Sequence, residues 1–287
     1  MLRDVEPWRA WDATDDEYAE LQIIREPIPD TLSDTIDHWL YQWFAGQSSY
    51  GRVNASIVNE LVAALRVMLP TNFDAAGFVE AIRAEGDRYT LQLVDYVLAK
   101  QSPYPPTGEM PPFVAGLARH MDLSASAVCV AQEGSRYRIA RRMVEGVEQA
   151  AQRAVDDANA TAGQHLATAW REMQSMAPDA SKVLRESIQA VEAAAGPIVI
   201  PKDTRPQLSK IVGALKQQEG WGLVLAQRDD AYPDHAVVLI GMLETLAFAE
   251  QHRHSGHGYS EVEAVGHVQL AATLTGWFSA GVVVRRQ

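Results

Sequence analysis

The spacing of apolar residues is the feature that most constrains how this chain folds. In the C-terminal third, apolar side chains recur every three or four residues in four segments, the period of a helix with one buried face. Proline, glycine and short polar runs separate these segments, so each helix must end before the next begins. Helices joined by short loops can bury such stripes only against one another, which predicts a bundle. The segments are Ser181–Ala195, Pro206–Gln218, His235–His252 and Glu261–Val284.

The same helical period fills most of the preceding sequence. Ser102–Pro112 interrupts it with five prolines and a glycine, and is predicted to be a loop or hinge. Ser126–Ile139 is the one predicted β element, because β-prone residues lie on both sides of a turn at Gly134. Val144–Met176 has the pattern of one long helix or a pair of helices. The other predicted helices are Asp30–Phe44, Asn54–Leu69, Asp74–Ala84 and Asp87–Lys100.

These breaks predict three parts within a mainly α fold that has no parallel sheet. Residues 1–29 precede the first strong helix signal and are predicted to be an acidic N-terminal tail. Residues 30–177 are predicted to form a multi-helical domain with a small β-hairpin near residues 126–139. Because Pro178 ends the long helical segment, residues 178–287 are predicted to form the four-helix bundle.

Composition limits where the chain can act. Hydrophobic residues make up 47% of the 287, which suits one large or two ordinary domains with ample core. No window approaches the roughly 18 apolar residues of a membrane helix, and the acidic start has no signal-peptide pattern. Cys129 is the single cysteine, so no intramolecular disulfide can form. We therefore expect a cytoplasmic protein without a membrane segment.

The net charge of −12 is unevenly distributed. Residues 1–40 hold eleven acidic and three basic side chains, whereas residues 181–287 hold eleven acidic and ten basic. An acidic chain is a poor nonspecific binder of nucleic acid. The nearly neutral C-terminal region remains compatible with a small local site for RNA.

The densest cluster of candidate catalytic residues is His252-Arg253-His254-Ser255-Gly256-His257-Gly258. It holds three of the eight histidines in the turn between the third and fourth predicted bundle helices. An imidazole can take a proton from a 2′-hydroxyl or give one to a leaving oxygen, and a guanidinium can stabilise the charge of a phosphodiester transition state. The cluster therefore permits RNA cleavage without a metal or another cofactor.

Two other interpretations of this cluster remain open. It is equally typical of a solvated polar loop whose histidines cap the flanking helices, since cations suit a helix C-terminus. Alternatively, His252, His254 and His257 could bind zinc or nickel, together with Glu250 or Glu261.

The C-terminal residues also resemble a known family. DASKVLRESIQAVEAAAG is followed by RPQLSKIVGAL, RHSGHG and EVEAVGHVQLAATLTGWF. This succession is similar to the HEPN-like C-terminal region of bacterial abortive-infection-type proteins. Those regions run from a helix with an "ES/EA…AVEA" pattern, through a short "TLGK"-like helix, to an "RH" or "RN…G.GHG" turn and a final helix rich in Ala and Leu.

The resemblance implies both a site and an assembly. Active members are metal-independent endoribonucleases with an Arg-x(4–6)-His motif, and they frequently form dimers in which two such loops face each other. Arg253 matches the arginine and His257 the histidine, although only three residues separate them, and His254 lies at a position that is usually polar. The implied protein is a homodimeric ribonuclease toxin or effector of antiviral defence. The alternative is a noncatalytic dimerisation module, whose acidic N-terminal half binds a protein partner or trigger.

Three weaker signals have ordinary structural interpretations. Cys129 lies in an apolar strand and is expected to be buried. Two tryptophan pairs could stack bases, but core packing is favoured for the second pair, which has helical spacing. A basic run after the β element could contact RNA phosphates, although a solvated face is the default. These residues are Trp8 and Trp11, Trp39 and Trp43, and Arg136, Arg138, Arg141 and Arg142.

Overall fold

The computed structural model is mainly helical, as the sequence predicted. Helices make up 67% of the described residues, and every strand pairing among them is antiparallel. No described helix is long and apolar enough to cross a lipid bilayer. The described residues are 9–21, 23–24, 26–68, 74–101, 110–143, 145–226, 234–254 and 259–286.

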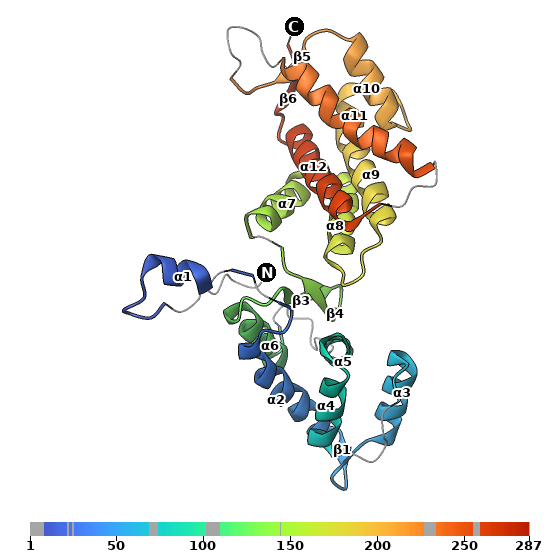
Figure 1. Cartoon of the computed structure of the whole chain (residues 1–287). Helices are drawn as coiled ribbons and strands as arrows, with labels where there is room; N and C mark the ends of the chain where they lie inside the picture. The colour runs from blue at the N-terminus through green and yellow to red at the C-terminus, as the bar shows by residue number, and fades with distance from the viewer. Residues whose placement is uncertain are drawn as a thin grey trace. The chain divides into compact units, whose positions relative to one another are not determined.

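The chain divides into two compact units, Met1–Arg142 and Met143–Gln287 (Figure 1). The division therefore lies earlier than the boundary predicted at residue 178. The reason is that α7 (Glu145–Asp157) and α8 (Ala160–Gln174) share a buried core with α9 (Ala180–Val199) and α12 (Glu261–Ser279). The break at Pro178 is thus a turn inside the second unit.

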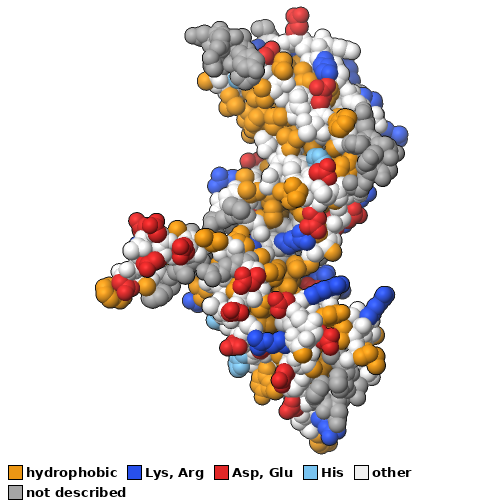
Figure 2. All heavy atoms as spheres, viewed as in Figure 1, with side chains coloured by type: hydrophobic (Ala, Val, Ile, Leu, Met, Phe, Trp, Pro, Cys, Tyr) orange, Lys and Arg blue, Asp and Glu red, His pale blue; other side chains and the backbone are white. Residues whose placement is uncertain are grey.

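The helices of the first unit pack around a hydrophobic core that contains several aromatic rings. The Trp39 ring stacks on the Phe113 ring at 4.6 Å between centroids, and the Phe44 and Phe78 rings lie 4.7 Å apart. Carboxylates gather on the part of the surface that carries α1, which lies within the predicted acidic tail (Figure 2). The helices are α1 (Asp15–Leu21), α2 (Asp30–Gly46), α3 (Ala55–Leu65), α4 (Ala75–Ala84), α5 (Asp87–Lys100) and α6 (Pro112–Leu123).

Two hairpins complete the described part of the first unit. The predicted hairpin is confirmed as β3 (Val128–Glu133) and β4 (Arg136–Arg141), with Val130 opposite Ile139. The second hairpin was not predicted and consists of β1 (Ser48–Ser49) and β2 (Arg52–Val53).

The second unit contains the helices predicted for the bundle, with two differences at their ends. They are α9, α10 (Leu208–Gln217), α11 (His235–His254) and α12. The last helix was predicted to reach Val284, but α12 ends at Ser279. Gly281 follows with a φ of +69°, and β6 (Val283–Arg285) then pairs with β5 (Trp221–Leu223).

The second difference is that α9 continues through Pro197, where the sequence predicted a stop. A proline inside a helix has no N–H to donate to the carbonyl four residues earlier. Here that carbonyl belongs to Ala193, and it accepts a hydrogen bond of 3.0 Å from the Asn159 side-chain amide. Asn159 also caps the start of α8, so one residue stabilises both helices.

Candidate functional site

The predicted catalytic cluster falls at the C-terminal end of α11. Arg253 and His254 occupy the last turn of this helix, which ends at His254. Their side chains and all of His257 lie outside the described residues, so the structure places the backbone of two of the three predicted site residues. The sequence predicted that this helix ends at His252, whereas α11 continues to His254. The assignment of these residues as a catalytic site remains a prediction.

Tyr259, which lies just before α12, contacts α11. Its hydroxyl donates a hydrogen bond to the carbonyl of Ala249, and its ring meets the His267 ring edge-on at 5.7 Å between centroids. The segment that contains Arg253, His254 and His257 therefore begins and ends at two residues held in contact.

The start of α12 is fixed by a reciprocal capping box. The Ser260 hydroxyl accepts a hydrogen bond of 3.2 Å from the Glu263 backbone N–H, while the Glu263 carboxylate accepts one of 2.8 Å from the Ser260 N–H. Such a box satisfies two N–H groups that would otherwise have no partner at a helix start. At the opposite side of the turn, the negative end of the α11 dipole favours cationic side chains.

His267 is a neighbour of this turn that the sequence analysis did not single out. It is half-buried on α12, and its Nδ1 atom is buried without a hydrogen-bond partner among the described residues. Burial lowers the pKa of the His267 imidazole, against an opposing effect of the Glu263 carboxylate. The imidazole therefore tends to be neutral. One sequence signal could have identified His267. The Ser260-to-Glu263 capping box marks the start of α12, and His267 lies in this helix directly before the buried Val268.

The metal interpretation receives no support from the described part of the chain. Within the described ranges, no group of three histidine, cysteine, aspartate or glutamate side chains is close enough to hold an ion. The side chains of His252, His254 and Glu250, and all of His257, lie outside these ranges, and Glu261 is exposed. This ligand set remains a prediction.

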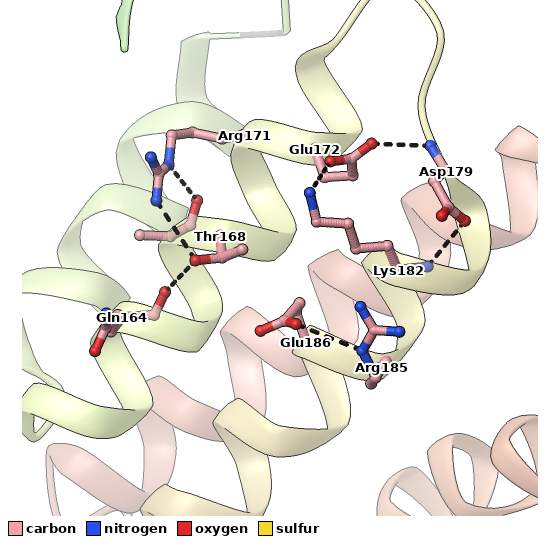
Figure 3. A network of polar contacts seen from close by, with 9 residues as sticks. Gln164, Thr168, Arg171, Glu172, Asp179, Lys182, Arg185 and Glu186 are labelled. Carbon is pink, nitrogen blue, oxygen red and sulfur yellow. Dashed lines mark hydrogen bonds and ion pairs between the residues drawn. The ribbon is translucent and has the colours of Figure 1, made fainter. Parts of the chain in front are cut away.

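A second polar cluster joins α8 to α9 (Figure 3). The Lys182 ammonium donates a 2.6 Å hydrogen bond to the Glu172 carboxylate, which also accepts one of 3.1 Å from the Asp179 backbone N–H. Burial raises the pKa of Glu172, but these hydrogen bonds outweigh it and hold the pKa below its usual range.

The same interface carries a histidine and a second carboxylate. His165 Nδ1 lies 2.8 Å from the Glu186 carboxylate, and the Arg185 guanidinium is 3.5 Å from its other oxygen. The two carboxylates of this interface, at Glu172 and Glu186, are thus paired across the helices, which explains the cluster as an interhelical contact.

Several of the remaining candidates have structural roles. Trp39 is buried and donates to the Phe113 carbonyl at 2.9 Å, which confirms core packing. Arg138 bonds the Asp95 carboxylate at 2.9 Å, and Arg142 bonds that of Asp122 at 2.7 Å. Trp43 packs edge-on against Phe44, Trp11 is exposed, and Trp8 lies outside the described residues. Cys129 was predicted to be buried but is only half-buried.

Comparisons with known proteins give no match: neither a family model, nor a curated protein, nor a solved structure matches this chain. The similarity to HEPN-like regions therefore depends on the C-terminal residues quoted from the sequence.

Proposed function

We propose that this chain is a metal-independent endoribonuclease of HEPN type, which acts in the cytoplasm in abortive infection or antiviral defence. The observation that supports it is that Arg253 and His254 end α11, while Tyr259, just before α12, donates a hydrogen bond back to the Ala249 carbonyl of α11. Arg253 and His257 are four residues apart, so their Cα atoms lie within about 14 Å of each other in any conformation. Their long side chains can then converge on one phosphate.

The chemistry follows from the residue types. One imidazole, from His257 or His254, takes the proton of the ribose 2′-hydroxyl as its oxygen attacks the phosphorus. The bond to the 5′-oxygen breaks, and a protonated imidazole gives this leaving oxygen its proton. Arg253 stabilises the additional negative charge on the phosphoryl oxygens. The products are a 2′,3′-cyclic phosphate and a 5′-hydroxyl.

The proposed enzyme is a homodimer formed through the second unit, because a two-fold axis would bring two such turns together. The alanines of the final helix do not supply an apolar surface for this contact, because Ala264, Ala271 and Ala272 of α12 are buried in the core. The outer face of α11 offers an alternative surface, with Val237 and Phe248 each 65% exposed. These residues are eleven positions apart, close to three helical turns, so they share one face.

The second candidate function is a noncatalytic dimerisation module. The observation that favours it is that the described bonds around the turn all stabilise helix ends, namely the capping box and the Tyr259–Ala249 bond. In this case the acidic N-terminal region, including α1, would bind a protein partner or trigger. The same region could equally hold the proposed enzyme inactive until it is triggered.

An RNA cleavage assay in EDTA tests the proposal. The wild-type chain should cut total RNA despite the chelator, and Arg253→Ala or His257→Ala should each lower the rate on the order of a hundredfold or more. His254→Ala identifies the base: if it alone abolishes cleavage, His254 rather than His257 is the catalytic histidine. Cleavage only with added divalent metal would support the metal site instead. Inactivity together with no toxicity in cells, even with a candidate trigger, would favour the noncatalytic module.

A further inference from the structure

The tip of the β1–β2 hairpin places a tyrosine where the backbone disfavours one. Ser49 pairs with Arg52, which leaves Tyr50 and Gly51 as a two-residue loop. Both have a positive φ, +53° for Tyr50 and +76° for Gly51. Loops of this kind favour Asn-Gly or Asp-Gly, because the left-handed conformation brings the Cβ of most residues too close to the backbone.

The Tyr50 side chain contributes nothing visible to the fold. It is fully exposed, at 102%, and makes no hydrogen bond or ring contact with the described residues. Two other non-glycine residues have a positive φ in the described ranges, and they differ, since Arg66 is the C-cap of α3 and Ala125 is buried. An unfavourable conformation combined with an unused side chain indicates a role outside the folded chain.

The segment of chain around Tyr50 carries a cation and no carboxylate. Arg52 follows two positions later and is exposed. Residues 38–59 contain no aspartate or glutamate, although the chain has 37 of them in 287 residues. Figure 1 shows this hairpin projecting beyond α4 at one end of its unit.

A free aromatic ring beside a guanidinium fits single-stranded nucleic acid, because a base stacks on the ring while a phosphate pairs with the cation. Tyrosine and arginine are also common in protein interfaces, but a stable interface buries about 20 to 30 residues on each side. A two-residue tip is better matched to one nucleotide of a strand.

We propose that Tyr50 and Arg52 form a base-stacking subsite for single-stranded RNA in the first unit. The choice of RNA as ligand rests on the proposed ribonuclease function. The subsite itself depends only on the hairpin and on the absence of carboxylates from residues 38–59.

Fluorescence anisotropy with a short fluorescein-labelled oligoadenylate tests the subsite. The full chain carries His257→Ala, and the buffer contains EDTA, so that the probe stays intact. Tyr50→Asn should bind roughly tenfold more weakly, whereas Tyr50→Phe should keep the affinity because it keeps the ring. Tyr50→Asn should also raise the thermal unfolding temperature, since asparagine tolerates the left-handed conformation. Tyr41→Asn is the matched control, because Tyr41 is also exposed but lies in the regular helix α2, and its affinity should not change.

These results test the RNA-binding subsite independently of the proposed ribonuclease activity. Equal affinity of Tyr50→Asn and its parent, an equal loss in Tyr41→Asn, or no binding of the probe would overturn the subsite. A more stable Tyr50→Asn with unchanged RNA affinity would point instead to a protein contact. If the wild type never cleaves RNA but binding still depends on Tyr50, the subsite stands and the ribonuclease proposal fails. If the wild type cleaves RNA but Tyr50 has no effect on binding, the ribonuclease proposal stands and the subsite fails.

Discussion

The two units are packed by different means. The first buries large rings, with Phe44, Phe78 and Tyr137 among its fully buried side chains, whereas Phe278 is the one such ring among the described residues of the second. The core of the second unit relies on small residues, which let its helices approach closely. These include Ala162, Ala169, Ala190, Ala264 and Ala271, each fully buried.

This difference teaches where each unit tolerates change. A core of large side chains loses most when a ring is removed, because a cavity remains. A core of small side chains loses most when a group is added, because closely packed backbones must separate. Removing a large side chain should therefore destabilise the first unit most, and enlarging a small residue should destabilise the second unit most.

The largest expected effect is the loss of a ring from the first unit. Phe78→Ala should lower the free energy of unfolding by about 3–5 kcal/mol, because Phe78 is fully buried against Phe44. Urea denaturation of the full chain measures this loss. Met68→Ala, at an exposed position of the same unit, is the control and should change stability by less than about 0.5 kcal/mol.

The next effect is the addition of a methyl group to the second unit. A Cβ at Gly163 would lie 2.7 Å from the backbone oxygen of Val155, so Gly163→Ala must push α8 away from α7. We expect a loss of about 1–3 kcal/mol, again by urea denaturation.

Gly276→Ala is the matched control for this helix contact. Its Cβ would meet Ala154 at an ordinary 3.6 Å, and alanine is about 0.5–1 kcal/mol better than glycine inside a helix. Gly276→Ala should therefore be neutral or stabilising. If both variants lose equal stability, close backbone packing does not explain the second unit.

The smallest effect concerns the pH dependence of the second unit. Burial lowers the pKa of His267 in the folded chain, so the unfolded chain takes up this proton at a higher pH. Stability must then fall as the pH drops through the ordinary histidine pKa of about 6.5. His267→Gln should reduce the loss of stability between neutral and mildly acidic pH. An identical pH profile for wild type and variant would show that His267 titrates normally.

The sequence predicted the positions of most helices because their apolar stripes repeat regularly. It did not predict the boundary at Arg142, since the alanines of α7 and α8 do not show which helix they will contact. The pairing of β5 with β6 was also missed, because strands of three residues carry little pattern.

At the candidate site, the sequence predicted that Arg253 and His254 follow a helix that ends at His252, but α11 includes both of them. It missed the anchoring of the turn by Tyr259 and His267, because contacts between Tyr259, Ala249 and His267 depend on how α11 and α12 meet. Spacing along the chain does not encode that geometry.

The most direct test of the central proposal is the chemical identity of the RNA ends. The full chain is incubated in EDTA with a defined single-stranded RNA, and the fragments are identified by mass spectrometry. Attack by the 2′-hydroxyl requires 2′,3′-cyclic phosphate and 5′-hydroxyl ends, and Arg253→Ala should remove them. Fragments with 3′-hydroxyl and 5′-phosphate ends, or cleavage that appears only with divalent metal, would contradict an Arg/His site.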